Sequence, residues 1–283
     1  MEQNNLLINY FNIIPLKRFV IIILLFIGIA KINAQVTNGV TGLLHMPNAE
    51  MQKDGTAIIG GNFLNKHNLP NNYWWGYNTF NYFINITFLS RIEISYICTL
   101  VKGQKHISYW PQQTWGKFVN QDRHFAARLQ VIKEGEWWKF MPSIVVGTND
   151  PTTGAQGDGF YYGGVGSSGN GYFNRWYIAI TKHFNIPWGE LGVHAAYLYN
   201  KRTDYPLNDP AFGINFRPDF HKNLNLIAEY DAKTFNIGAT YALWADHFNF
   251  LVELQEGKYL SAGLVYKVNL KGGNRWKSKI LDY

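Results

Sequence analysis

A two-residue alternation of side-chain character constrains this chain more than any other feature of its sequence. In residues 258–270, one face carries Leu260, Ala262, Leu264, Tyr266 and Val268, and the other carries Ser261, Gly263, Val265 and Lys267. A period of two is typical of a β-strand that separates two different media. Two arrangements meet this condition. Either two sheets pack their apolar faces together, or one sheet closes with apolar side chains on lipid and polar side chains around a lumen.

The same alternation predicts strands along most of the chain. Further strands are expected at residues 56–63, 77–88, 91–100, 123–132, 137–148, 173–183, 191–200, 211–217, 223–231, 234–243 and 247–255. The fifth of these contains Pro142, a residue that cannot donate to a strand ladder. Residues 159–166 are compatible with an extension of a neighbouring strand.

The lengths of the connections favour a barrel over a sandwich. The connections after the first, third, fifth and seventh strands are long, whereas those after the second, fourth, sixth, eighth and tenth are short. Outer-membrane barrels have this asymmetry, with short turns on one side of the membrane and longer loops on the other. We therefore predict an all-β fold, a transmembrane antiparallel up-and-down β-barrel of about 12 strands, an even number as in bacterial barrels.

The N-terminus predicts export from the cytoplasm. Lys17 and Arg18 precede the apolar run 19–29, which is followed by small residues up to Ala34. A basic region, a short apolar core and a small residue at the cut are typical of a secretory signal peptide, here residues 1–34. The alternative is a retained anchor, but the run is shorter than the roughly 20 residues of a helical span. The outer membrane of a Gram-negative bacterium is the expected location.

The mature chain then divides into two parts. Residues 35–268 form the predicted outer-membrane barrel, in which residues 35–53 are a candidate plug or entry segment, and residues 269–283 form a basic periplasmic tail. We expect outer-membrane lipid to surround the barrel. The composition gives no reason to expect a nucleic-acid partner.

Charged residues on the polar faces are expected to line the lumen. They are Arg128, Arg175, Arg217, Lys267, Glu93, Glu229 and Glu253. A charge that faced lipid near the midplane would cost about 2–4 kcal/mol, so these side chains must point inward. Two interpretations remain open: the acidic and basic residues pair and brace the wall, or the arginines form a path for an anionic polymer.

The sequence offers no catalytic or metal-binding constellation. Ser95, Ser143 and Ser261 fall on lumen faces without the histidine partner that a lipid hydrolase needs on the outward face. The eight histidines show no ligand spacing on one face, and the single Cys98 excludes an internal disulfide. We expect no cofactor and no metal.

The last predicted strand resembles the insertion signal of outer-membrane barrels. Ser261, Gly263, Tyr266 and Val268 reproduce its order of polar, glycine, aromatic and hydrophobic residues. The resemblance implies that the barrel insertion machinery is a partner during assembly. Fifteen residues follow Val268, whereas the signal ordinarily ends its chain.

A second resemblance concerns the beginning of the mature chain. Residues 41–51, TGLLHMPNAEM, followed by Asp54-Gly55-Thr56, resemble the opening of the YjbH-like family of outer-membrane β-barrel proteins. The residues that carry it are Gly42, Met46, Pro47, Ala49 and Gly55. Turn chemistry at a strand entry would also explain Gly42, Pro47 and Gly55.

The family resemblance implies a role in exopolysaccharide and capsule production. The leading hypothesis is a non-enzymatic barrel that assists polysaccharide export or surface assembly, with a polysaccharide and export lipoproteins as partners. A general small-solute channel is the first alternative. An outer-membrane lipid hydrolase is the second.

Overall fold

The structure is a computed structural model that describes residues 39–70, 74–105, 107–151, 172–200 and 208–271. The predicted signal peptide 1–34, residues 159–166 and the basic tail beyond residue 271 lie outside these ranges.

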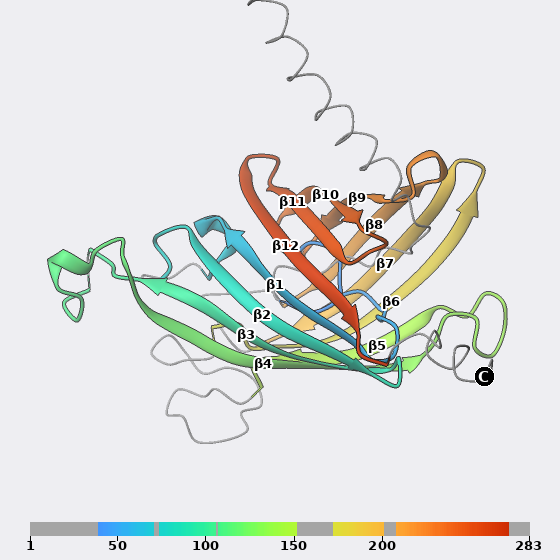
Figure 1. Cartoon of the computed structure of the whole chain (residues 1–283), viewed down its shortest axis with the longest axis horizontal. Coiled ribbons are helices and arrows are strands. Elements are labelled where there is room, and N and C mark those ends of the chain that lie inside the picture. Colours follow the sequence, from blue (N-terminus) through green and yellow to red (C-terminus); the bar gives the residue numbers. More distant parts are fainter. Residues whose placement is uncertain (1–38, 71–73, 106, 152–171, 201–207, 272–283) are drawn as a thin grey trace, which may run out of the picture.

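Twelve antiparallel strands form one closed barrel, which confirms the predicted fold class (Figure 1). Each strand pairs with its neighbours in sequence, and β12 pairs with β1. The strands are β1 (Thr56–Leu64), β2 (Thr79–Phe88), β3 (Ile92–Lys102), β4 (Phe118–Ile132), β5 (Ser143–Asn149), β6 (Arg175–Ile186), β7 (Gly189–Tyr199), β8 (Pro210–Pro218), β9 (Leu224–Tyr230), β10 (Phe235–Leu243), β11 (Phe248–Gln255) and β12 (Tyr259–Asn269).

In the described parts of the connections there are three short helical turns. These are the 3-10 turns η1 (Lys66–Asn68), η2 (Gln112–Thr114) and η3 (Asp219–His221). Within the described ranges, no helix has both the length and the apolar character needed to cross a membrane.

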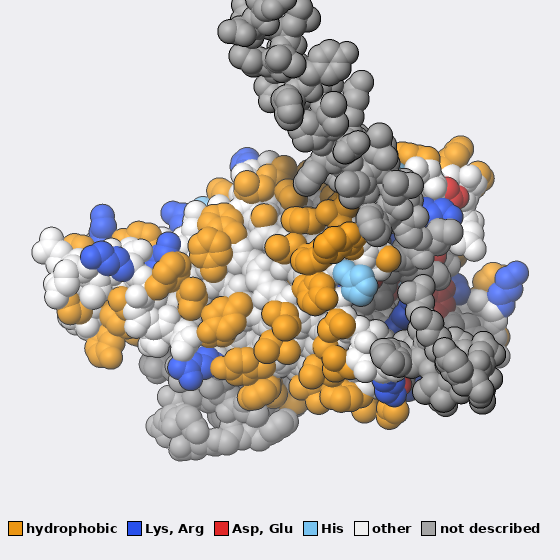
Figure 2. Space-filling view, viewed as in Figure 1, with side chains coloured by type: hydrophobic (Ala, Val, Ile, Leu, Met, Phe, Trp, Pro, Cys, Tyr) orange, Lys and Arg blue, Asp and Glu red, His pale blue; other side chains and the backbone are white. Residues whose placement is uncertain are grey.

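The alternation in the sequence becomes an inside and an outside of the barrel. In β2, Phe80, Tyr82 and Ile84 are 46%, 48% and 49% exposed, whereas Asn81 and Asn85 are buried. Figure 2 shows hydrophobic side chains gathered over the outward face of the front strands. An apolar outer surface of this extent is typical of a protein that contacts lipid rather than water.

The fifth strand is shorter than the sequence predicts. β5 begins at Ser143, and residues 137–142 form a turn instead of the expected start of a strand at Trp137. Pro142 has no N–H for a strand ladder, and the N–H of Gly135 donates to the carbonyl of Met141 at 3.0 Å to close the turn. The interior proline therefore sets the beginning of the strand. By contrast, β4 is longer than predicted, since it begins at Phe118 rather than Arg123.

The hydrophobic core lies inside the barrel. Residues 39–53, named here the inner segment, bury Leu43, Leu44, Met46 and Ala49 against the inward faces of the wall. The wall residues of this core are small or apolar; among them are Val145, Ala179, Ala196, Leu198 and Ala211. The expectation of a polar inward face therefore holds only in part for β5 to β8. Polar residues such as Arg175, Thr181 and His194 do point inward, but apolar residues stand between them because these strands pack against the inner segment.

The seam between β12 and β1 places the residues of the insertion-type signal. Tyr266 lies opposite Ile59 and points outward, and Gly263 lies opposite Asn62. A side chain at position 263 would collide with the Asn62 amide. Ser261 is buried on the inward face, where its hydroxyl accepts a hydrogen bond from Asn68 Nδ2 at 2.7 Å. Val268 pairs with Ala57 near the end of the seam.

Candidate functional site: the inner segment and its cradle

The inner segment folds back on itself within the lumen. Gly42 and Pro47 form an antiparallel bridge, and the N–H of Leu43 donates to the carbonyl of Met46 at 3.1 Å. Leu44 and His45 therefore form the tip of a tight loop. Four residues of the family motif at positions 41–56 thus belong to the part of the inner segment that is buried inside the barrel: Gly42, Met46, Pro47 and Ala49.

The carboxylate of Glu229, from β9, binds the tip of this loop. It accepts hydrogen bonds from the backbone N–H groups of Leu44 at 2.9 Å and His45 at 2.7 Å, and from Met46 at 3.3 Å. Three successive N–H groups around one carboxylate form an anion-binding nest. The His45 ring lies between Asp231, 2.9 Å from Nδ1, and Glu253, 2.7 Å from Nε2. Two flanking carboxylates favour the charged imidazolium.

The opposite side of the wall binds both ends of the loop. Glu93, from β3, accepts hydrogen bonds from the N–H of Thr41 at 2.7 Å and from its hydroxyl at 2.8 Å. Arg128, from β4, donates to the carbonyls of Thr41, Asn48 and Glu50, the last two at 2.7 and 2.6 Å. The guanidinium and the carboxylate therefore hold the backbone of the inner segment rather than each other.

Arg175 acts in the same way at the tip. Its Nη1 donates to the carbonyl of His45 at 3.3 Å. Among the residues that the structure describes, neither Arg128 nor Arg175 forms an ion pair with Glu93, Glu229 or Glu253. Of the two interpretations of the lumen charges, direct bracing pairs with Glu93, Glu229 or Glu253 are therefore wrong for these arginines. The reason is that the inner segment brings unpaired backbone groups, which must be satisfied once they are buried.

Arg217 and Lys267 form ion pairs with partners that the sequence analysis did not name. Arg217 lies 2.7 Å from Glu50 and 2.6 Å from Glu190, and Lys267 lies 3.2 Å from Asp246. Glu190 and Asp246 border the short turns, and Glu50 belongs to the inner segment. These pairs could not be predicted, because the partners are far apart along the chain.

Two glycines of the wall, neither of them among the predicted site residues, make room for the tip. A side chain at Gly213 in β8 would collide with Leu43, and one at Gly238 in β10 would lie 2.8 Å from Leu44. A glycine inside a strand often marks a close approach of another part of the chain. This signal was available at both positions.

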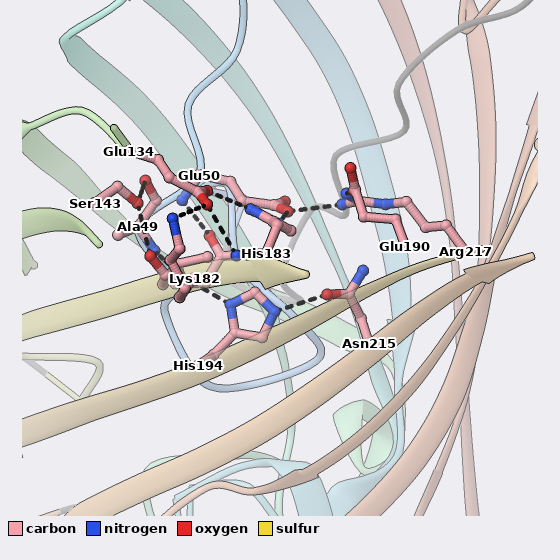
Figure 3. A network of polar contacts seen from close by, with 12 residues as sticks. Ala49, Glu50, Glu134, Ser143, Lys182, His183, Glu190, His194, Asn215 and Arg217 are labelled. Atoms are coloured by element: carbon pink, nitrogen blue, oxygen red, sulfur yellow. Dashed lines mark hydrogen bonds and ion pairs between the residues drawn. The ribbon is translucent and has the colours of Figure 1, made fainter. Parts of the chain in front are cut away.

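The inner segment leaves the lumen through a polar network at the end of the barrel that carries the short turns (Figure 3). The N–H of Ala49 donates to the Thr181 hydroxyl at 2.8 Å, and its carbonyl accepts from Gln130 at 2.9 Å and Ser143 at 3.1 Å. His194 continues the network from Thr181, at 2.9 Å. These contacts fix the position of Ala49 against three strands.

Glu50 is the centre of the charged part of the network. Its carboxylate contacts Arg217 and the Nε2 of His183, the latter at 2.8 Å, and His183 Nδ1 lies 2.6 Å from Glu134 (Figure 3). Burial alone would raise the pKa of Glu50, but Arg217 and the hydrogen bond from His183 hold this pKa well below its usual range. Glu134 behaves likewise: burial raises its pKa, and the hydrogen bonds from His183 outweigh burial and lower it.

A cavity of about 590 Å³ opens at this end of the barrel. The inner segment contributes Glu50 and Lys53 to its lining, and the wall contributes His183, Arg217 and Lys267 among others. The lining contains both acidic groups, such as Glu134 and Glu190, and basic groups, so its charges largely compensate each other. Beyond it, Gly55 adopts a positive φ of 74° and donates its N–H to the carbonyl of Thr87 at 2.9 Å, which turns the chain into β1.

Among the described residues, two groups bring potential metal ligands within 4.8 Å of one another. One is His45, Glu229 and Asp231, and the other is Asp122, His124 and Asp150. In the first group, the carboxylate of Glu229 already binds the tip of the inner segment. In each group two members stand two residues apart in the sequence, Glu229 with Asp231 and Asp122 with His124, but the third comes from a separate part of the chain, so spacing alone did not predict the groups.

Comparison with known proteins identifies the family. The YjbH family model, described as exopolysaccharide biosynthesis protein YbjH, matches residues 34–204. The chain belongs to the YjbH family. The match covers the inner segment and β1 to β7, so the wall residues Glu93, Arg128 and Arg175 lie within it and Glu229 and Glu253 lie beyond it. The family resemblance predicted from residues 41–56 is confirmed.

The other two comparisons add little to this identification. No curated protein matches the chain. A solved structure, that of the outer membrane protein AlkL determined by solid-state NMR in DMPC lipid bilayers, is 13% identical with a TM-score of 0.16. The alignment covers 82% of this chain and 99% of AlkL. We draw no inference from a likeness at this level.

Proposed function

We propose that this YjbH-family chain is a non-enzymatic outer-membrane barrel that assists the export or surface assembly of an exopolysaccharide, and that the inner segment closes its lumen at rest. The family supports the connection with exopolysaccharide. The closed barrel with its apolar outward surface supports the location.

Aromatic side chains at the short turns also support an outer-membrane location. Trp137, Trp188 and Trp244 are 68%, 70% and 56% exposed and lie in or beside short turns. Exposed tryptophans at strand ends are typical of the interface between the hydrocarbon region and the headgroups. A barrel in water would gain nothing from exposing them.

One observation carries the proposal: the charged groups that could line a pathway bind the inner segment instead. Glu93, Glu229 and Arg128 are 0%, 3% and 2% exposed, and each one hydrogen-bonds to the backbone of residues 41–50. A general small-solute channel needs such groups to face water. An occupied lumen fits an accessory that opens only in the export assembly, or one that acts from its surfaces.

The placement of the serines supports a role without catalysis. The hydroxyls of Ser95 and Ser143 donate to the carbonyls of Gly39 and Ala49 at 2.9 and 3.1 Å. Both point toward the inner segment and away from the lipid side, where a lipid hydrolase would need its nucleophile.

The experiment that tests the proposal compares cells with and without the gene. Surface polysaccharide is measured on whole cells with an antibody or a stain, and total polymer is measured after lysis. We expect deletion to lower surface polymer while intracellular polymer persists, and a plasmid copy to restore it. Unchanged surface polymer in the deletion strain would contradict the proposal. Uptake of a small hydrophilic dye serves as a control, since its loss would favour the general channel.

A further inference from the structure

A hollow in the outward surface of the barrel lies over β4, β5 and β6. It has a volume of about 570 Å³, and its lining includes Ala127, Leu129, Val146, Thr148 and Trp176. A volume of this size lies in the range of sites that bind small molecules. It is separate from the cavity beside the inner segment.

The strand register explains why the surface is hollow at this place. Ala127, Thr148 and Trp176 are direct partners across β4, β5 and β6 and form one row of outward positions, which Tyr199 of β7 continues. In this row the small residues Ala127 and Thr148 therefore lie beside two large aromatic residues, and the surface is hollow over the small ones.

The next outward row is uniformly large. Leu129, Val146, Ile178 and Tyr197 are partners across the same strands, and all four are exposed. The hollow is thus bordered by apolar side chains that belong to the proposed lipid-facing surface, and an apolar chain of a lipid would contact it continuously.

Thr148 provides the second, independent observation. It is 8% exposed and is one of the residues that line the hollow, and its buried hydroxyl has no hydrogen-bond partner among the described residues. A buried hydroxyl without a partner is unfavourable, and a ligand with a carbonyl or hydroxyl group would satisfy it. The site therefore fits an amphiphile that carries an ester or hydroxyl group close to its chain, rather than a plain hydrocarbon.

The position of the hollow along the strands indicates which leaflet it faces. Thr148 is next to the last residue of β5, at the end of the barrel that carries the long loops. On the outward side of β4, Ala127 is followed toward the same end by Phe125 and the exposed Arg123. Four residues of strand place Arg123 about 13 Å beyond Ala127, at the height of a lipid headgroup. An arginine there is suited to a phosphate group.

We propose that this hollow binds one acyl chain of an anionic outer-leaflet glycolipid of the lipid A type, with Thr148 hydrogen-bonding its ester or hydroxyl group and Arg123 facing its phosphate. The inference rests on the proposed outer-membrane location with the long loops outside. The outer leaflet of that membrane is built from lipid A, which carries ester-linked and hydroxylated chains together with phosphate.

The test measures lipid retained by the purified, folded barrel in detergent. Native mass spectrometry is recorded after addition of lipid A, phosphatidylglycerol or phosphatidylethanolamine in turn. We expect one molecule of lipid A per barrel and little of either phospholipid. Ala127→Phe fills the hollow and should abolish retention, whereas Ala239→Phe, at an outward position of β10, is the matched control and should retain lipid A. Thr148→Val keeps the shape and removes the hydroxyl, so its affinity should fall about fivefold.

Two results would overturn the inference. Equal retention by the Ala127→Phe and Ala239→Phe proteins would show that the hollow is not the site. Equal retention of phosphatidylglycerol and lipid A would show that the ligand is not a glycolipid. Heat-modifiable gel mobility confirms that each variant is folded. Surface polysaccharide of the same strains is scored separately, so a failure of lipid binding with normal export leaves the proposed function standing.

Discussion

Arg128 should hold the inner segment in the lumen, and its replacement should release that segment without unfolding the barrel. The guanidinium donates to three carbonyls of the inner segment, those of Thr41, Asn48 and Glu50. Hydrogen bonds to a charged group contribute about 1.5–3 kcal/mol each. Water that enters the lumen would replace part of this, so we expect Arg128→Met to weaken docking by about 3–5 kcal/mol.

The expected change in population follows from this free energy. Since about 1.4 kcal/mol corresponds to a factor of ten, the undocked fraction should rise by roughly two to three and a half powers of ten. The barrel wall should stay intact, because β4 keeps its ladders to β3 and β5.

Cysteine labelling measures the undocked fraction. Met46 is fully buried, so Met46→Cys in a Cys98→Ser background reacts with a maleimide only when the inner segment leaves its site. The labelling rate should increase by the factor given above in Arg128→Met. Arg123→Met, an exposed position on the same strand, is the matched control and should leave the rate nearly unchanged. Equal rates in the two folded variants would refute the role assigned to Arg128.

Three further predictions concern orientation, pH and assembly. The variant Thr114→Cys, in the loop before β4, should react with an impermeant maleimide on intact cells, whereas Ser90→Cys, in the short turn after β2, should not. Reversed labelling would show that the barrel has the opposite orientation in the membrane. Because the pKa of Glu50 is lowered in the folded protein, this residue stabilises the fold above its ordinary pKa of 4.5, and the stabilisation is lost as the pH falls further. The melting temperature of Glu50→Gln should therefore lie below that of the parent protein at neutral pH and approach it in acid. A difference in melting temperature that stays constant at all pH values would contradict this. Tyr266→Asp places a charge on the outward face of the seam and should lower the heat-modifiable fraction, and an unchanged yield would locate the assembly signal elsewhere.

The barrel itself was predictable because its surface chemistry is periodic. Every strand that contacts an apolar medium on one side must alternate, so residues such as Phe80, Tyr82 and Ile84 identify β2 without any structure. Pro142 was the exception that moved the start of β5, and its missing N–H was already visible in the sequence.

The cradle of the inner segment was only partly predictable. The inward positions of Glu93, Arg128 and Glu229 follow from the alternation, but their partners do not. These partners are backbone N–H and carbonyl groups, which every residue other than proline possesses and which leave no mark in the sequence. The apolar residues on the inward faces of β5 to β8 were missed for a related reason, since Ala179 and Leu198 make sense only once Leu43 and Met46 pack against them.

Conductance of the purified protein in planar bilayers tests the central claim most directly. The claim is that the inner segment occupies the lumen, so the wild-type barrel should remain silent to small ions and the Arg128→Met barrel should show long-lived open events. Arg123→Met, measured beside it, should be as silent as the wild type. Steady open pores in the wild-type protein would contradict the claim and would favour a general small-solute channel.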